Sequence, residues 1–187
     1  AVADYVLKHT PGNTVSNLSS SRALKDVTEA YGQQYHAAAV GEVNVVAEMK
    51  RTHSVIGGEG NGGVIYPESH YGRDALVGVG LFLSHYVAQS KKMTELKSTY
   101  PPYFISKNKM TLSPDMDVDK ILEGLKERYA TEKVTDIDGV KIDFAQGWVH
   151  LRKSNTEPII RIYSEAKDEA AANQLAEEVI AAAKSTL

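Results

Sequence analysis

The chain has 187 residues, of which 24% are charged and 42% are hydrophobic, and these ordinary globular values exclude a disordered or fibrous protein. Its net charge of −3 comes from scattered charged residues, which argues against a general nucleic-acid-binding surface. The lack of cysteine excludes disulfides, thiolate metal sites and a cysteine nucleophile, and no apolar run approaches the roughly 18 residues of a membrane helix. We therefore expect a cytoplasmic protein without a membrane partner, long enough for two small domains.

Residues 1–9 are expected to form a helix, because apolar and aromatic residues recur there at helical spacing. The chain has no initiator methionine, and the helical pattern starts at its first residue. We therefore expect that the sequence begins inside a larger protein.

Strands and helices alternate up to about residue 100. The expected strands are 14–18, 34–38, 54–56 and 63–66, and the expected helices cover 23–31, the residues after Gly41, 73–90 and 93–98. The predicted core faces of two of these helices are Val43, Val46 and Ala47, and Leu76, Val79, Gly80, Leu83 and Val87. This alternation predicts an α/β domain over residues 1–101.

Tyr100-Pro101-Pro102 interrupts the pattern, since proline restricts its own backbone and that of the preceding residue. Beyond it we expect strands at 103–112, 140–144, 148–152 and 159–165, and helices at 118–129 and 168–183. Short loops between the later strands require antiparallel pairing. Residues 102–187 are therefore predicted to form an α+β domain, with a four-stranded antiparallel sheet and two helices.

A polar segment lies between two strand-like runs near the end of the chain: Arg152-Lys153-Ser154-Asn155-Thr156-Glu157-Pro158. We expect it at the tip of a hairpin. The planar guanidinium of Arg152 suits two phosphate oxygens, and Ser154 and Thr156 add hydroxyl donors. Asn155 tolerates the left-handed backbone that turns successive N–H groups one way. The segment indicates an oxyanion clamp, with a purely structural polar turn as the alternative.

A second segment, Gly57-Gly58-Glu59-Gly60-Asn61-Gly62-Gly63, separates two predicted strands. Its five glycines let a ligand approach the backbone closely, and Glu59 and Asn61 can bind a diol as acceptor and donor. A flexible hairpin turn is the alternative. The glycine spacing does not fit a dinucleotide-binding fingerprint, and no helix follows directly.

Other polar groups have structural explanations. Arg73-Asp74 at a helix start is typical of a cap, and Ser19-Ser20-Ser21 supplies capping oxygens without an activating base nearby. The six histidines lack metal-ligand spacing, and no aspartate cluster has the density of a Mg²⁺-binding loop. We therefore expect no metal-binding residue in this chain.

Taken together, the two segments resemble two loops of the α-D-phosphohexomutases, the enzymes that include phosphoglucosamine mutases and phosphoglucomutase/phosphomannomutases. Residues 152–158 are similar to their C-terminal phosphate-binding loop, and residues 58–63 to their sugar-binding loop. The resemblance covers essentially the whole chain and extends to Gly72-Arg73-Asp74. It implies domains 3 and 4 of a four-domain enzyme: a three-layer α/β/α domain with a small mixed sheet, then a domain like the TATA-binding protein.

The resemblance implies an isomerase that moves a phosphoryl group between positions 1 and 6 of a hexose phosphate, through a hexose 1,6-bisphosphate. Glu59 and Asn61 would then bind sugar hydroxyls, while Arg152, Ser154, Asn155 and Thr156 would hold the non-reacting phosphate. The phosphoserine and the Mg²⁺ loop belong to the first two domains, so we expect no catalytic residue here and no turnover by this chain alone. Its partners would be a hexose phosphate and those N-terminal domains.

Two departures bear on the sugar that is bound. Many relatives carry Ser and His where this chain has Asn61 and Gly63, and some place a lysine where Ala39 and Val40 stand. A non-catalytic phospho-ligand-binding or interaction module is the alternative function. RNA binding is disfavoured, because the predicted strands show no paired aromatic platform.

Overall fold

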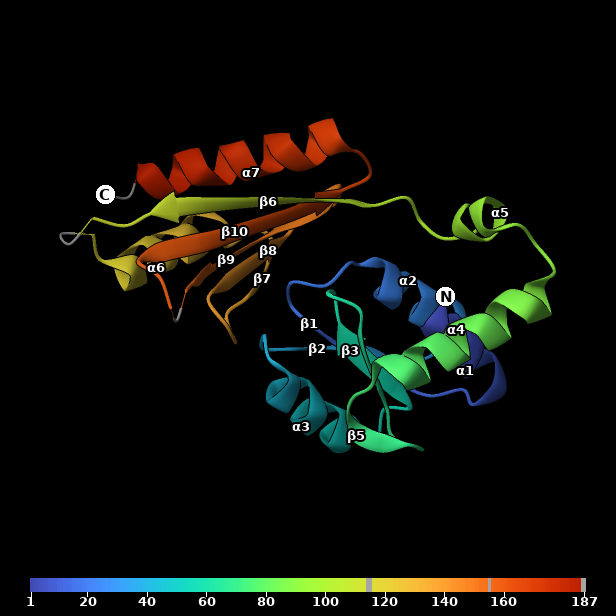
Figure 1. Ribbon diagram of the computed structural model, residues 1–187. Coiled ribbons are helices and arrows are strands. Elements are labelled where there is room, and N and C mark those ends of the chain that lie inside the picture. The colour runs from blue at the N-terminus through green and yellow to red at the C-terminus, as the bar shows by residue number, and fades with distance from the viewer. Residues whose placement is uncertain (114–115, 155, 186–187) are drawn as a thin grey trace. The chain divides into compact units, whose positions relative to one another are not determined.

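The computed structural model describes residues 1–113, 116–154 and 156–185. The chain divides into two compact units, Ala1–Pro102 and Tyr103–Leu187, each with its own sheet and helices (Figure 1). Within the described ranges, no helix combines the length and apolar character that crossing a membrane requires.

A mixed five-stranded sheet forms the middle of the first unit, in the order β2-β1-β3-β4-β5. Its strands are β1 (Thr14–Asn17), β2 (Tyr35–Ala38), β3 (Ile56–Glu59), β4 (Gly63–Tyr66) and β5 (His70–Arg73). β1 runs parallel to β2 and β3, whereas β3, β4 and β5 are antiparallel. The predicted mixed sheet is confirmed, and β5 is a strand that the sequence reading missed.

Helices cover both faces of this sheet, as expected for a three-layer α/β/α domain. One layer contains α1 (Val2–His9), α2 (Ala23–Ala30) and α4 (Ala75–Gln89), the opposite layer is α3 (Glu42–Thr52), and the short α5 (Met93–Lys97) follows α4. Val45 and Met49 of α3 pack with Val15 and Ile65 of the sheet. On the other face, Gly78 of α4 lies against Val64.

The predicted inner face of α4 is wrong, and that of α3 is right only for Val46, which is partly buried and packs against the core, whereas Val43 and Ala47 are exposed. α3 buries Val45, Met49 and Thr52, and Val43 is exposed. α4 buries Gly78 and His85, while Leu76, Val79, Leu83 and Val87 face outward. The physical reason in α4 is that its 15 residues include no charged side chain, so apolar residues lie all round the helix and their spacing selects no face.

An antiparallel sheet in the order β6-β10-β9-β8-β7 forms the second unit. The strands are β6 (Phe104–Thr111), β7 (Lys133–Thr135), β8 (Val140–Asp143), β9 (Gly147–Lys153) and β10 (Ile159–Ala166). The predicted antiparallel sheet is confirmed, and it gains a fifth strand, β7. β7 was not predicted because three residues are too few to show the alternation of apolar and polar side chains that marks a strand.

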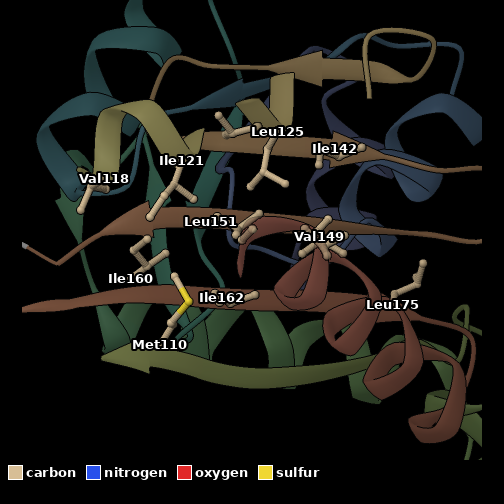
Figure 2. Packing of buried hydrophobic residues seen from close by; sticks show 14 of the residues in the cluster. Met110, Val118, Ile121, Leu125, Ile142, Val149, Leu151, Ile160, Ile162 and Leu175 are labelled. Atoms are coloured by element: carbon tan, nitrogen blue, oxygen red, sulfur yellow. The ribbon is translucent and has the colours of Figure 1, made fainter. Parts of the chain in front are cut away.

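Two helices pack on the same sheet, α6 (Val118–Arg128) and α7 (Glu169–Lys184). Each begins at an aspartate whose carboxylate accepts backbone N–H bonds, Asp117 for α6 and Asp168 for α7. Figure 2 shows the core between helices and sheet, where Ile121 and Leu125 of α6 and Leu175 of α7 lie over strand residues such as Leu151. This core holds β9 and β10, the two strands that are joined by the polar segment.

Candidate functional site

The glycine-rich segment of the first unit forms the end of the β3–β4 hairpin: Gly57, Gly58 and Glu59 belong to β3, and Gly63 begins β4. Glu59 pairs with Gly63 across the hairpin, and the Gly62 N–H donates to the Glu59 carbonyl oxygen at 3.1 Å. The exposed Asn61 uses its Oδ1 to accept the Gly63 N–H at 3.0 Å. Its amide nitrogen has no hydrogen-bond partner among the described residues, so it can donate to a ligand.

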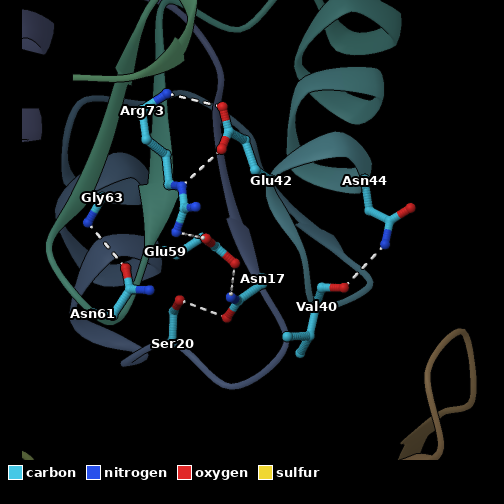
Figure 3. Close-up of polar contacts among 9 residues, drawn as sticks. All are labelled: Asn17, Ser20, Val40, Glu42, Asn44, Glu59, Asn61, Gly63 and Arg73. Atoms are coloured by element: carbon cyan, nitrogen blue, oxygen red, sulfur yellow. Dashed lines mark hydrogen bonds and ion pairs between the residues drawn. The ribbon is translucent and has the colours of Figure 1, made fainter. Parts of the chain in front are cut away.

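Glu59 is held from two sides. Its side chain is only 6% exposed, and its Oε2 pairs with Arg73 Nη1 at 3.0 Å. Its Oε1 accepts a hydrogen bond from Asn17 Nδ2 at 2.9 Å (Figure 3). A carboxylate has about four acceptor positions, so these bonds leave room for ligand hydroxyls.

Arg73 joins this carboxylate to a second one at the start of α3. Its Nε donates to Glu42 Oε2 at 2.8 Å, and its backbone N–H donates to Glu42 Oε1 at 3.1 Å. The backbone bond from Arg73, followed by the bond from its side chain, lowers the pKa of Glu42 below the ordinary value. Arg73 therefore takes part in the site, whereas Asp74 is the cap of α4 and accepts the Val77 N–H at 3.0 Å.

Asn17 connects Glu59 to the serine-rich loop. Its Oδ1 accepts bonds from the Ser19 N–H at 3.1 Å and from Ser20 Oγ at 2.9 Å. A cavity of about 220 Å³ lies beside this network and is lined by Ser20, Glu59 and several glycines of the hairpin. Sequence reasoning missed Asn17 and Glu42, which have no motif of their own. For Arg73 the sequence did offer a signal, because Gly72-Arg73-Asp74 after the hairpin is part of the resemblance to the family.

The polar segment of the second unit starts inside β9, of which Arg152 and Lys153 are the last two residues, and it ends before β10 begins at Ile159. Arg152 pairs with Arg161, Lys153 pairs with Ile160, and the Ser154 N–H donates to the Ile159 carbonyl oxygen at 3.0 Å. The segment therefore begins where two hydrogen-bonded strands of the sheet end. Rigid strands below a short connection give its side chains a defined direction.

The segment carries two hydroxyl groups and a guanidinium group. Ser154 is buried, and its Oγ lies 3.4 Å from both the N–H and the Oγ1 of Thr156. Arg152 Nε is buried and has no hydrogen-bond partner among the described residues. Glu157 pairs with Arg161 instead, at 2.8 Å. The predicted clamp residue Asn155 lies outside the described residues.

The described residues bring no three His, Asp or Glu side chains close enough together to hold a metal ion. Among the histidines of the first unit, His70 Nε2 lies 3.0 Å from Asp74 Oδ2, and His85 Nε2 lies 2.7 Å from the Tyr100 hydroxyl. These contacts give both histidines a structural role within the first unit.

Two family profiles match consecutive parts of the chain. Residues 1–103 match "Phosphoglucomutase/phosphomannomutase, alpha/beta/alpha domain III", and residues 107–182 match "Phosphoglucomutase/phosphomannomutase, C-terminal domain".

Curated relatives agree with these matches. A phosphoglucosamine/phosphogalactosamine mutase of Sulfurisphaera tokodaii is 36% identical over 88% of this chain and 37% of its own length. A phosphoglucomutase/phosphomannomutase of Thermococcus kodakarensis is 37% identical over 94% of this chain and 39% of its own length. The chain thus spans less than half of either relative.

A solved structure has the same fold. The phosphoglucomutase/phosphomannomutase family protein of Burkholderia thailandensis superposes with a TM-score of 0.80 at 23% identity, covering 98% of this chain and 40% of that one.

Proposed function

The chain belongs to the phosphoglucomutase/phosphomannomutase family, and we propose that it is the substrate-binding C-terminal part of a phosphohexomutase. The larger enzyme would be an isomerase that interconverts hexose 1- and 6-phosphates through a hexose 1,6-bisphosphate. Its substrate would be glucosamine phosphate, or glucose and mannose phosphates, in keeping with the names of the two relatives.

The observation that carries this proposal is the buried Arg152 Nε, which has no partner among the described residues and lies in the same segment as Ser154 and Thr156. A buried guanidinium nitrogen without an acceptor is unfavourable, and a phosphate oxygen would supply that acceptor. Glu157 is not its acceptor in this structure: its carboxylate contacts Arg161, and Arg152 Nε has no partner among the described residues. We assign the non-reacting phosphate to Arg152, Ser154, Asn155 and Thr156.

We assign sugar hydroxyls to Glu59 and Asn61. The carboxylate of Glu59 is held in place by Arg73 and Asn17 and keeps free acceptor positions. The Asn61 amide nitrogen is available as a donor. An acceptor and a donor near each other suit two neighbouring ring hydroxyls and would respond to their orientation.

Holding the sugar and the remote phosphate supplies positioning, on which phosphoryl transfer depends strongly. Binding energy from these non-reacting parts of the substrate can offset the cost of orienting the reacting end. The phosphoserine and Mg²⁺ that the family resemblance implies are assigned to other domains, and the described residues offer no cluster that fits the ion. The role proposed for this chain is therefore binding.

The phosphate assignment is tested by calorimetric titration of this chain with glucosamine 6-phosphate and glucose 6-phosphate. Arg152→Ala should weaken binding by about 1.5–3 kcal/mol, the usual value of a hydrogen bond to a charged group. Arg128→Ala removes the same charge from the exposed end of α6 and is the matched control. Equal binding by both variants would contradict the clamp.

The sugar assignment is tested separately. Asn61→Asp keeps the acceptor for the Gly63 N–H but removes the amide donor. We expect weaker binding of the hexose phosphates and unchanged binding of inorganic phosphate. An equal loss for both ligands would show that the new negative charge, and not the lost donor, causes the effect.

A further inference from the structure

Asn61 and Gly62 form the single Asn-Gly pair in the sequence. Asparagine is chemically labile when glycine follows it, because the next backbone nitrogen can attack the side-chain amide carbon and glycine has no side chain to hinder the approach. The other asparagines are followed by larger residues: Thr14, Leu18, Val45, Lys109, Thr156 and Gln174. The sequence therefore singles out the hairpin to which sugar contacts were assigned above.

The tip of the β3–β4 hairpin leaves room for this reaction. Asn61 is exposed, and its amide nitrogen, which would leave as ammonia, has no hydrogen-bond partner among the described residues. Gly62 has φ +91°, and a side chain built there would meet nothing within 4 Å. Open space therefore lies beside the nitrogen that has to move.

Two backbone contacts of the hairpin affect the rate. The Gly63 N–H donates to Asn61 Oδ1 at 3.0 Å (Figure 3), and it would stabilise the negative charge that this oxygen gains when the amide carbon is attacked. The Gly62 N–H donates to the Glu59 carbonyl oxygen at 3.1 Å, and this bond must open before the nitrogen can react. A single turn bond at an exposed tip opens more readily than a strand pair inside a sheet.

We propose that Asn61 is a site of spontaneous deamidation in the folded chain and that the reaction switches off sugar binding. Hydroxide removes the proton of the Gly62 nitrogen, which then bonds to Asn61 Cγ. The Cγ–Nδ2 bond breaks, and Nδ2 takes a proton from water and leaves as ammonia. Water then opens the resulting succinimide at either carbonyl and gives aspartate or isoaspartate, so one water is consumed for each ammonia released.

The product lacks the property that the sugar contact uses. A carboxylate replaces the amide, so the donor at Asn61 is lost, and a negative charge is added two residues from Glu59 in the same hairpin. Isoaspartate also adds a carbon atom to the main chain before Gly62. A hexose phosphate is itself an anion, so the added charge opposes its binding. This consequence rests on the proposed function, whereas the deamidation does not.

The reaction is followed by mass spectrometry on the folded 187-residue chain, incubated at pH 6 and at pH 8. Trypsin releases residues 52–73 as one peptide, in which Asn61 has the only amide side chain, so a conversion there is unambiguous. Asn44 is the internal control, because it is also exposed but lies in α3 and precedes Val45. Asn61→Gln is the matched variant, since its longer side chain would have to close a larger ring.

At pH 8 we expect conversion at Asn61 to be at least about tenfold faster than at Asn44, because only Asn61 precedes glycine. Conversion should be slower at pH 6, since the attack requires a deprotonated nitrogen, and absent from the Asn61→Gln peptide. Equal rates at Asn61 and Asn44, or conversion at Asn61 only after unfolding in urea, would overturn the deamidation and leave the proposed function untouched.

The effect on binding is measured on incubated chain from which the unconverted molecules have been removed by anion exchange. Its titration with glucosamine 6-phosphate should show binding at least as weak as that of Asn61→Asp, while inorganic phosphate still binds. Fully converted chain that binds the sugar phosphate as strongly as fresh chain would overturn the switch and the sugar contact assigned to Asn61, and the deamidation would stand.

Discussion

At the scale of single residues, the contacts of Glu59 follow from the cost of burying a charge. An ionised carboxylate that is largely removed from water requires a cation and hydrogen-bond donors. Arg73 provides the cation and Asn17 the donor, and Arg73 is itself held by Glu42. The sugar-binding role proposed for Glu59 therefore depends on three residues that come from β1, β5 and α3.

His150 gives a prediction about pH. Burial, partly opposed by the hydrogen bond with the Asp138 carbonyl oxygen, lowers the pKa of His150 to about 4. The ordinary value is about 6.5, so between these pH values the unfolded chain binds a proton that the folded chain does not. The resulting stability is fully present above pH 6.5 and is lost as the pH falls towards 4, by up to about 1.4 kcal/mol per unit.

The measurement is the free energy of unfolding in urea at several pH values between 4 and 8. His150→Gln can keep a donor for the Asp138 carbonyl oxygen and cannot titrate, so it should show a shallower slope between pH 4 and 6.5. Above pH 7 the free energy of unfolding should depend on pH in the same way for the original chain and for His150→Gln. A slope in the acidic range that is the same for both would refute this role of His150.

At the scale of elements, both candidate binding segments are connections between antiparallel strands. The strand ends are fixed by ladder hydrogen bonds and by the cores below them. Side chains supported in this way have a defined geometry.

The turn before β8 lies close to the backbone of β9 at Leu151 and Arg152. Gly139 has φ +68°, and a side chain there would meet the Leu151 carbonyl oxygen and the Arg152 backbone. Gly32 has φ +69°, and a side chain there would meet nothing within 4 Å. It is therefore a matched control for the effect of the backbone conformation alone.

Gly32→Ala should cost about 1 kcal/mol of stability, from the left-handed backbone. Gly139→Ala should cost roughly 1–3 kcal/mol more, because β9 must shift, and it should weaken hexose phosphate binding. Urea unfolding followed by circular dichroism, together with the titration above, measures both effects. The same stability loss for the two variants would show that the contact with β9 relaxes without cost.

At the scale of the whole molecule, the role proposed for this chain is to bind substrate, and the reacting groups are expected in other domains. We expect no conversion of a hexose 1-phosphate into the 6-phosphate by this chain in a coupled enzymatic assay with Mg²⁺ and hexose 1,6-bisphosphate. The reason is that, by family resemblance, the phosphoserine and the metal loop lie in domains outside it. Turnover by the purified chain would mean that the nucleophile is among these 187 residues.

Much of the architecture was predictable from local patterns. Proline and glycine positions located the turns, and helical spacing located α1, α6 and α7, because such signals act between near neighbours in the chain. The three-residue β7 was too short to give a signal, and β5, with its sequence His-Tyr-Gly-Arg, has no alternating apolar pattern. Both strands form because an existing sheet edge offers them hydrogen bonds.

The sequence by itself determined the fold class and the two polar segments, since periodicity and residue chemistry are local properties. Only the tertiary structure decided that Asn17, Glu42 and Arg73 surround Glu59, and that Glu157 pairs with Arg161 while Arg152 Nε has no partner among the described residues. It also decided which side of α4 is buried. Contacts between distant residues depend on how the elements pack, and an uncharged helix carries no local information about its outer face.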